Sequence, residues 1–576
     1  MMRRRLTMCA LALACLASAA PAPASSSSAP GLDDIFDAVG TLAGQAKRGP
    51  LQPIDLSQLT TAKAQLGLDD VRLDRWLVQL PSSQREAVAG MVVAVSEATL
   101  AVRDALSSGR TIDQAAITAA GLDLVRRLGP MRTELSRIRV QQASCFGDNI
   151  LCVGTEGDDR WEDEVQILID PAGDDTYLNN AGGTINETLF PAAAGCTFGG
   201  GTTGRAAPNL GCTATPSTVC TYDTANRATD RDDLPVVGIP GHTDPGQGDA
   251  DSGSCGSDER FDRTIAGAQG TPQEAHGRLV SVALDLDGSD TYLAPWSHED
   301  PLFDLLEDCF PGDASKVNTN RDFVQGSALG GIGILWDDGD GNDNFRGRLN
   351  SQGSGHVGGF GALLTTGRGD ATFWADRLSQ GNGIGGGVGV LANLKDGAQA
   401  YLLDPPEVYR NEFSPNARGC QQEGRAGQGQ GGFGGIGVLA TLGGSSSTYR
   451  AVTHVTEEAF PYSPVLDADG EPALVPGTDA QGSGESFPIS ATMGGVVLGA
   501  GLLVDDTAGD SRTCAQHRRA GMVRGSTTSV GEDLSTIGLP DRSCGAFNTM
   551  PEFAAGSLGE AIGHLLGGAV GVRVVL

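Results

Sequence analysis

Apolar residues recur with one period before about residue 145 and with another after it. In the stretch SQREAVAGMVVAVSEATLAVRDAL they recur every three to four positions, so that Val88, Met91, Val92 and Val95 share one face. The stretch TIDQAAITAAGLDLVRRLG repeats this pattern. The periodicity predicts a small helical bundle over residues 25–144, which we interpret as a capping or positioning domain.

After residue 145 glycine alternates with apolar residues in short runs such as GGIGIL, GGFGAL, GGVGVL and GGIGVL. A period of two is typical of β-strands. Two markers recur between these runs. One is a turn sequence, G-x-D-x-aromatic, seen in GDDRW, GDDTY, GSDTY and GNDNF, and the other is a Gln-Gly pair. Glycine adopts positive φ freely and Asp or Asn caps its own backbone, so these markers predict tight turns.

The spacing of the two markers defines a repeat. The distance is 21 residues from Gln352 to Phe373 and from Gln380 to Tyr401, and seven residues from Phe345 to Gln352 and from Phe373 to Gln380. The unit is therefore 28 residues long. Later repeats are longer only between the aromatic residue and the next glutamine. Insertions confined to one place in every repeat are typical of stacked coils.

These patterns predict a mainly β fold, a Gly-rich parallel β-solenoid of about 28-residue coils that follows a small N-terminal α-helical domain. Residues such as Ile332, Phe360 and Val388 would stack as internal ladders about 4.8 Å apart, and the glycine face would let another layer of backbone approach closely. A β-propeller is the alternative fold, although its blades usually need about 40 residues or more. The segment from about 150 to 515 resembles the parallel β-solenoid architecture of exported bacterial repeat proteins.

The remaining boundaries follow from composition. Residues 1–24 combine a basic start, MMRRR, with an apolar stretch of small residues and A-x-A sites, which indicates a signal peptide and export. The solenoid domain is assigned to 145–556, with an irregular, disulfide-rich insertion at 181–266. Residues 557–576 repeat the Gly-apolar alternation and would close the last coil.

The net charge and the absence of long apolar segments limit the kinds of partner expected. The formal net charge is −31 at pH 7, which disfavours binding to nucleic acid. No segment after the signal peptide is long and apolar enough to predict a transmembrane helix in the mature chain.

Ten of the 12 cysteines remain after removal of the signal peptide. An even number in an exported chain favours disulfides, with Cys145–Cys152 and Cys514–Cys544 as candidate pairs.

Calcium is the candidate cofactor. The turns DLDGSD and DDGDGND place carboxylates at alternate positions beside glycines, as Ca²⁺-binding loops do. The candidate metal ligands are Asp285, Asp287, Asp290, Asp338, Asp340 and Asp343. The G-x-D turns also resemble the calcium-binding nonapeptide repeats of secreted RTX proteins, although the period here is 28 residues. The competing interpretation is that each Asp only forms its turn, since later repeats carry Gln399 and Ser447 in place of the acid.

Catalytic motifs are absent from the sequence. The seven histidines do not pair at metal-ligand spacing, and no nucleophile or phosphate-loop motif occurs. Repeat register could bring Arg346, Arg348, Arg377 and Asp376 onto one face, as in a polysaccharide-active enzyme. The expected function is instead a non-enzymatic structural or binding protein of the cell envelope or extracellular space, whose loops meet a protein or glycan partner. A polysaccharide-active solenoid enzyme and a calcium-stabilised scaffold are the alternatives.

Overall fold

The structure is a computed structural model that describes the chain in segments. The described residues are 31–45, 51–107, 112–185, 196–198, 202–204, 220–221, 278–293, 323–347, 350–375, 378–403, 427–432, 434–454, 474–476, 482, 484–489, 495–507, 511–514, 554–555, 558 and 571–575. The predicted signal peptide lies outside them, as does most of the predicted insertion.

Helices occupy the N-terminal part of the described chain. They are α2 (Leu32–Leu42), α3 (Leu59–Leu66), α4 (Val71–Gln79), α5 (Ser82–Ser107), α6 (Gln114–Leu128) and α7 (Arg132–Leu135), with short 3-10 turns at Leu56–Gln58 and Gly129–Met131. The predicted stripe on α5 is buried. Helix α6 begins after Asp113, whose carboxylate accepts a hydrogen bond from the backbone N–H of Ala116 and so satisfies one free donor of the first turn.

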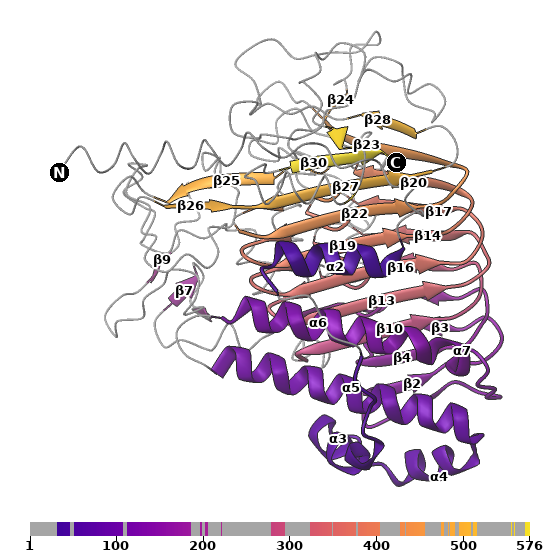
Figure 1. The fold of residues 1–576 in the computed structure, drawn as a ribbon. Coiled ribbons are helices and arrows are strands. Elements are labelled where there is room, and N and C mark those ends of the chain that lie inside the picture. The colour runs from indigo at the N-terminus through magenta and orange to yellow at the C-terminus, as the bar shows by residue number, and fades with distance from the viewer. Residues whose placement is uncertain are drawn as a thin grey trace, which may run out of the picture.

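Three long sheets follow the helices, and most of their strands are parallel (Figure 1). Sheet 1 has the order β1 (Ser144–Phe146), β2 (Leu151–Val153), β4 (Ile167–Asp170), β10 (Val280–Asp285), β13 (Ile332–Asp338), β16 (Phe360–Thr366), β19 (Val388–Asn393), β22 (Ile436–Leu442), β27 (Ala500–Asp506), β30 (Gly571–Val575) and β29 (Ala554–Ala555). Sheet 2 has the order β24 (Leu474–Pro476), β23 (Ser446–His454), β20 (Ala398–Leu403), β17 (Ala371–Ala375), β14 (Asp343–Arg346), β11 (Thr291–Leu293), β5 (Thr176–Tyr177) and β3 (Arg160–Trp161), and β28 (Ser511–Cys514) also pairs with β23.

The third long sheet is built from shorter strands. Sheet 3 has the order β26 (Gly495–Leu498), β25 (Gly484–Ile489), β21 (Gly431–Gly432), β18 (Gly383–Ile384), β15 (Gly355–His356), β12 (Ala328–Leu329) and β6 (Thr184–Ile185). A separate small sheet contains β8 (Thr202–Gly204), β7 (Cys196–Phe198) and β9 (Cys220–Thr221).

In the described chain the repeats that begin with β4, β10, β13, β16 and β19 each contribute one strand to each long sheet, in the order sheet 1, sheet 2, sheet 3. In sheet 1 Ile332 pairs with Phe360, and Phe360 pairs with Val388. In sheet 2 Phe345 pairs with Phe373. These partners are one 28-residue repeat apart, so the predicted period and the parallel stacking of equivalent segments are confirmed. The strands of the described chain form neither a closed barrel nor a propeller.

A column of aromatic rings runs along the inner side of sheet 2. Adjacent rings have centroids 4.5–5.0 Å apart and planes within 8° of parallel. The column comprises Tyr177, Tyr292, Phe345, Phe373, Tyr401 and Tyr449, all fully buried. It packs against inner leucines of sheet 1 such as Leu335 and Leu363. The ring spacing is close to the separation of neighbouring strands, so each repeat adds one ring in direct contact with the last.

The expected position of the Ile, Phe and Val ladder is wrong. Ile332, Ile334 and Phe360 belong to a core shared with the N-terminal helices rather than to the interior between the sheets. Phe360 packs so closely on α6 that a Cβ atom at Gly121 would lie 2.4 Å from its ring. Helices α5, α6 and α2 lie across this outer face of sheet 1 (Figure 1). The apolar ladder therefore faces outward because the helices bury it.

The glycines that alternate with this ladder face inward, against another layer of backbone, as expected. A Cβ atom at Gly361 would lie 2.0 Å from the carbonyl oxygen of Ser354, and one at Gly389 would lie 2.0 Å from that of Asn382. Real Cβ contacts are never this short. Glycine is therefore required where sheet 1 meets the turn that leads into sheet 3.

The Gln-Gly pairs form these turns. Gln352 and Gly353 both have positive φ, 56° and 76°. The Gln352 side-chain amide donates hydrogen bonds to the carbonyls of Phe345 (3.0 Å) and Trp374 (2.9 Å), which belong to consecutive repeats of sheet 2. Gln380 bridges the next two repeats in the same way. The glutamine thus offsets an unfavourable backbone conformation by satisfying two strand-end carbonyls.

Several predicted boundaries can be compared with the described residues. The Cys145–Cys152 disulfide is present and joins β1 to β2. The partner predicted for Cys514 lies outside the described chain. Residues 181–185 still belong to a repeat, because β6 pairs with β12, so the excursion predicted from 181 begins later. Strand β30 extends sheet 1 beyond β27, in the segment expected to close the repeats.

Candidate metal centre

Buried carboxylates gather in three groups between sheets 1 and 2. The groups are Asp159, Asp170 and Asp175 (cluster 1), Asp175, Asp285 and Asp290 (cluster 2), and Asp290, Asp337 and Asp343 (cluster 3). Within each group one carboxylate oxygen from every residue lies within 4.8 Å of the others. All of these side chains are buried except Asp159, which is partly exposed. Because neighbouring clusters share Asp175 or Asp290, they form one continuous row along the stack of repeats.

The strand register produces this row. Sheet 1 contributes Asp170, Asp285 and Asp337, which are direct neighbours on β4, β10 and β13. Sheet 2 contributes Asp159, Asp175, Asp290 and Asp343, which stand immediately before or at the start of β3, β5, β11 and β14. Each pair of acids flanks the tight turn that carries the chain from sheet 1 to sheet 2. Stacking of the repeats brings these turns, and therefore the acids, into contact.

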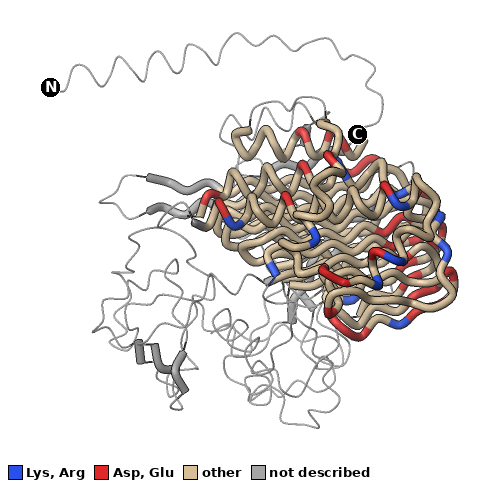
Figure 2. Tube along the Cα trace, turned by 90° about the horizontal axis from the view of Figure 1, so that it is seen from below, with Lys and Arg blue, Asp and Glu red and all other residues tan. Residues whose placement is uncertain are grey.

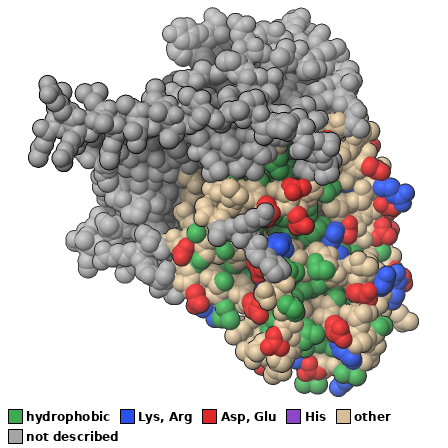
Figure 3. All heavy atoms as spheres, in the orientation of Figure 1, with side chains coloured by type: hydrophobic (Ala, Val, Ile, Leu, Met, Phe, Trp, Pro, Cys, Tyr) green, Lys and Arg blue, Asp and Glu red, His purple; other side chains and the backbone are tan. Residues whose placement is uncertain are grey.

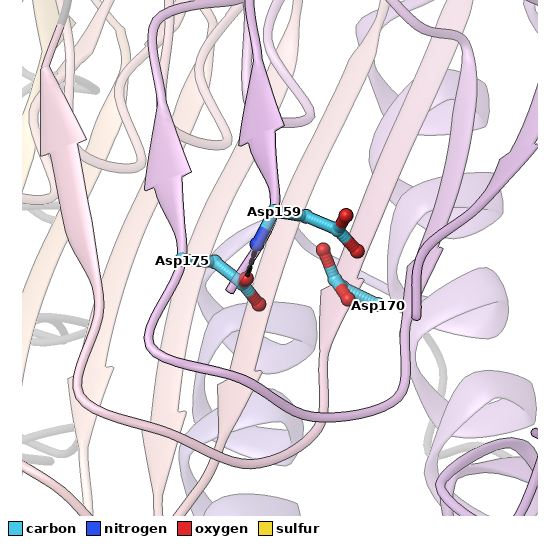
Figure 4. Close-up of side chains that lie close together, drawn as sticks. All are labelled: Asp159, Asp170 and Asp175. Carbon is cyan, nitrogen blue, oxygen red and sulfur yellow. Dashed lines mark hydrogen bonds between the residues drawn. The ribbon is translucent and has the colours of Figure 1, made fainter. Parts of the chain in front are cut away.

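Figure 4 shows the geometry of cluster 1. The carboxylates of Asp159 and Asp170 point toward one another, and Asp175 approaches from the neighbouring strand. Oδ1 of Asp175 accepts a hydrogen bond of 2.6 Å from the backbone N–H of Asp159.

The same backbone contact recurs along sheet 2. Oδ1 of Asp290 accepts from the N–H of Asp175 (2.7 Å), and Oδ1 of Asp343 accepts from the N–H of Asp290 (3.0 Å). These bonds tie each turn to the next, so they support the interpretation of the aspartates as turn-forming residues. They account for only one oxygen of each carboxylate.

Two acids of sheet 1 also use one carboxylate oxygen each in a hydrogen bond within the protein. Oδ2 of Asp170 accepts from the hydroxyl of Tyr177 (3.1 Å), and Oδ2 of Asp285 accepts from that of Tyr292 (2.8 Å). Both hydroxyls belong to the aromatic column.

The second oxygen of four of these acids has no hydrogen-bond partner in the described chain. These atoms are Oδ1 of Asp170, Oδ2 of Asp175, Oδ1 of Asp285 and Oδ2 of Asp290. Each side chain is at most 1% exposed, so water does not satisfy the atom from the surface. Unpartnered buried carboxylate oxygens are costly, and here they converge on clusters 1 and 2.

Cluster 3 differs because it contains a cation of the protein itself. The ammonium of Lys395, from a turn two repeats further along the chain, forms ion pairs with Asp337 Oδ1 (3.4 Å) and Asp343 Oδ2. It also donates hydrogen bonds to the carbonyl oxygens of Gly339 (3.1 Å) and Gly341 (3.3 Å). The Lys395 side chain is fully buried.

The crowding of these acids strongly favours a compensating positive charge. Two carboxylates 4.8 Å apart repel by roughly 3.5 kcal/mol at an effective dielectric constant of 20. Burial raises the pKa of Asp290 to about 9 and that of Asp175 to about 7, and it raises the pKa of Asp285 well above its usual value, with neighbouring carboxylates adding to the effect in each case. At neutral pH such groups must hold a proton or a cation.

The donor set fits calcium better than other common metals. It consists of carboxylate oxygens, and the Lys395 contacts show that turn carbonyls also face the row. Ca²⁺ accepts six to eight such ligands in flexible geometry, whereas Mg²⁺ usually retains several waters, for which a buried row is unfavourable. Zinc prefers nitrogen and sulfur ligands, and neither occurs in the three clusters.

The structure divides the six predicted ligands into two sets. Asp285, Asp290 and Asp343 lie in the clusters. Asp287, Asp338 and Asp340 lie on the outer side of the same turns, outside every cluster of the described chain. Acidic segments are frequent along this edge of the molecule (Figure 2).

These three outer acids have other partners. Asp338 forms an ion pair of 2.7 Å with Arg132 after α6, and Asp340 pairs with Arg368 of the next repeat. Asp287 accepts a hydrogen bond of 3.4 Å from the backbone N–H of Asp340.

Four cluster members were not among the predicted ligands: Asp159, Asp170, Asp175 and Asp337. A signal for two of them exists, because Asp170 precedes Asp175 by five residues, as Asp285 precedes Asp290. The sequence carries no corresponding signal for Lys395, whose long side chain reaches past an intervening repeat.

The residues of the alternative catalytic constellation are only partly described. The guanidinium of Arg346 lies 5.3 Å from the ring centroid of Trp374. Arg348, Asp376 and Arg377 lie outside the described residues, so the proposed constellation is not tested. His356 is fully buried in sheet 3, where burial lowers its pKa to about 3, so it is unsuited to proton transfer near neutral pH.

No helix in the described chain has both the length and the apolarity needed to cross a membrane. Comparison with protein families, with characterised proteins and with solved structures finds no match to this chain.

Proposed function

We propose that the protein is an exported, non-enzymatic β-solenoid scaffold whose interior binds divalent cations, calcium in particular, at clusters 1 and 2. The observation that carries this proposal is the convergence of unpartnered carboxylate oxygens from fully buried acids. A turn-forming role explains one oxygen of each acid and leaves the other in an apolar interior without compensation.

The charge balance supports the same conclusion. Six buried acids, Asp170, Asp175, Asp285, Asp290, Asp337 and Asp343, face one buried ammonium, that of Lys395. If all were ionised, the row would carry a formal charge of −5. Two divalent cations would reduce this to −1. The formal charge of the row therefore favours one bound cation in each of clusters 1 and 2.

The wider role is that of a structural or binding protein of the cell envelope or extracellular space. Extracellular calcium is abundant enough to fill even weak sites, and calcium would stiffen the stack in an exported protein. We place the contact with a protein or glycan partner in the segments of variable length that separate the repeats in the sequence. The face seen in Figure 3 carries interspersed acidic and basic side chains.

The test is to remove divalent cations from the mature protein. Bound metal is first measured by elemental analysis of the purified protein after desalting. Thermal unfolding is then followed in excess calcium, excess magnesium and excess EGTA. The proposal expects bound calcium and a melting temperature that falls in EGTA and recovers with calcium but not with magnesium. An unchanged melt together with no bound metal would refute it.

A further inference from the structure

The buried ammonium of Lys395 lies where the row of clusters would otherwise continue with a further cation. Its nitrogen contacts one carboxylate oxygen each from Asp337 and Asp343, together with the backbone carbonyls of Gly339 and Gly341. All four partners are oxygen atoms, two carboxylate and two carbonyl. This is the ligand chemistry of a calcium site, with three N–H donors in place of the metal.

The turn that carries Lys395 does not need a lysine side chain in order to form. The turn that carries it is equivalent to those at Gly339, Gly367 and Gly443, which have no side chain at this position. The intervening repeat has Thr365 where sheet 1 would carry an acid.

The intervening repeat also lacks an acid in sheet 2, where Ala371 pairs with Asp343. These small side chains leave space for Lys395 to reach the acids two repeats away. The length of the Lys395 side chain therefore matches the gap left by the small residues of the intervening repeat.

We propose that Lys395 is a tethered cation that takes the place of a third metal ion and ends the cation row at cluster 3. This inference rests on the proposed function, because it treats clusters 1 and 2 as metal sites. It adds that the number of bound ions is limited by one lysine, and that cluster 3 is a metal site blocked by the chain itself.

The experiment compares Lys395→Met with the wild-type protein. Methionine keeps an unbranched apolar stem of similar length and removes the ammonium, so it leaves the carboxylates of cluster 3 free to bind an ion. Bound calcium is measured by equilibrium dialysis at saturating free calcium. Terbium luminescence provides a second readout, since the Tyr292 hydroxyl oxygen lies 3.1 Å from Oδ2 of Asp337 and the tyrosine can sensitise an ion bound beside it.

The expected result is one additional bound ion per chain in Lys395→Met. The matched control is Lys63→Met, which removes a buried lysine paired with Asp74 in the helical region and should leave the ion count unchanged. If the wild-type protein binds calcium and Lys395→Met binds no additional ion, the inference is overturned and the proposed function remains intact. A wild-type protein without metal would refute the proposed function, and a gain of one ion in the variant would still support the role of Lys395.

A second variant covers the case in which Lys395→Met does not fold without calcium. The double variant Lys395→Met/Asp343→Asn removes one charge of each sign, so it should fold in EGTA and bind no third ion. Folding of the single variant only in calcium, with the double variant folding in both conditions, supports the inference. Failure of the single variant to fold even in saturating calcium, while the double variant folds, would overturn it.

Discussion

Replacing Asp290 by asparagine should stabilise the protein much more without calcium than with it. Asp290 is shared by clusters 2 and 3, and its Oδ1 accepts the N–H of Asp175. Asparagine keeps this oxygen and the size of the side chain. The substitution therefore removes the charge of the second oxygen and leaves the turn-to-turn hydrogen bond in place.

The expected gain without calcium follows from the pKa of Asp290. Burial raises this pKa from 3.8 to about 9 in the folded protein, so the folded state holds a proton at pH 7 and the unfolded state does not. A raised carboxyl pKa means that stability is full below the unfolded pKa and is lost as pH rises toward the folded value. Over the interval from 3.8 to 7 this amounts to about 4 kcal/mol. The asparagine of the variant is neutral in both states, so Asp290→Asn should recover up to this amount in EGTA.

In calcium most of this gain should disappear, leaving about 1 kcal/mol. A ligand that binds only the folded state at one hundred times its dissociation constant contributes about 2.7 kcal/mol, and loss of a carboxylate ligand forfeits most of it. Urea-induced unfolding at pH 7, in excess calcium and in excess EGTA, measures both effects. The control is Asp340→Asn, which lies outside the clusters and should change stability by no more than about 0.5 kcal/mol in either condition.

Two outcomes would refute this reasoning. Stabilisation of the Asp290 variant by a similar amount in both conditions would mean that no cation compensates the cluster. Equal destabilisation in both conditions would mean that the carboxylate serves only the turn.

Two further predictions test the packing and the buried histidine. Gly361→Ala should destabilise the protein by about 3 kcal/mol or more in urea unfolding, because the new Cβ would lie 2.0 Å from the carbonyl oxygen of Ser354, whereas Gly157→Ala, with its nearest atom at 4.0 Å, should be nearly neutral. For His356, burial lowers the pKa from 6.5 to about 3, so stability is lost as pH falls below 6.5, by about 2 kcal/mol at pH 5. His356→Ile, which copies the paired Ile384 of the next repeat, should abolish this loss when unfolding at pH 7 and pH 5 is compared with wild type; an unchanged pH dependence would exclude His356 as its source.

The repeat could be predicted from sequence because its signals are local. Alternation of glycine with apolar residues specifies strands, and the constant distance from Gln352 to Phe373 and from Gln380 to Tyr401 specifies a unit in which three short strands fit. The inward face could not be predicted in the same way. Ile332 and Leu335 are both apolar, and only the helices of the N-terminal part decide that the first is covered from outside and the second from inside.

The candidate site could be predicted only in part because its members are far apart in sequence. Asp175 and Asp290 are in contact across 115 residues, and Asp290 and Asp343 across 53, because long excursions separate these repeats. The period of 28 residues is therefore hidden where the acids lie. The prediction also included Asp287, Asp338 and Asp340, because the sequence does not show on which side of a turn each acidic side chain lies.

The repeats that follow cluster 3 show why the acids are unlike ordinary turn residues. The sheet 1 positions that carry Asp285 and Asp337 continue as Thr365, Asn393 and Thr441, before an acid returns at Asp505, which accepts a hydrogen bond from the Ser447 hydroxyl. At Thr365, Asn393 and Thr441 the side chains are neutral and their hydrogen bonds are made within the chain. Thr365 donates to Asn393 (2.8 Å), Asn393 donates to the Tyr401 hydroxyl (3.0 Å), and Thr441 donates to the same hydroxyl (2.7 Å).

The same turn between sheets 1 and 2 is thus built in two ways, one without charge and one with a row of carboxylates. Since the neutral version forms the turn and satisfies its own polar groups, the fold does not require the acids. Carboxylates in this position cost stability unless a positive charge accompanies them. The ammonium of Lys395 lies at the boundary between the two versions and supplies that charge to the last acidic cluster. By the same reasoning, clusters 1 and 2 are expected to obtain theirs from a bound cation.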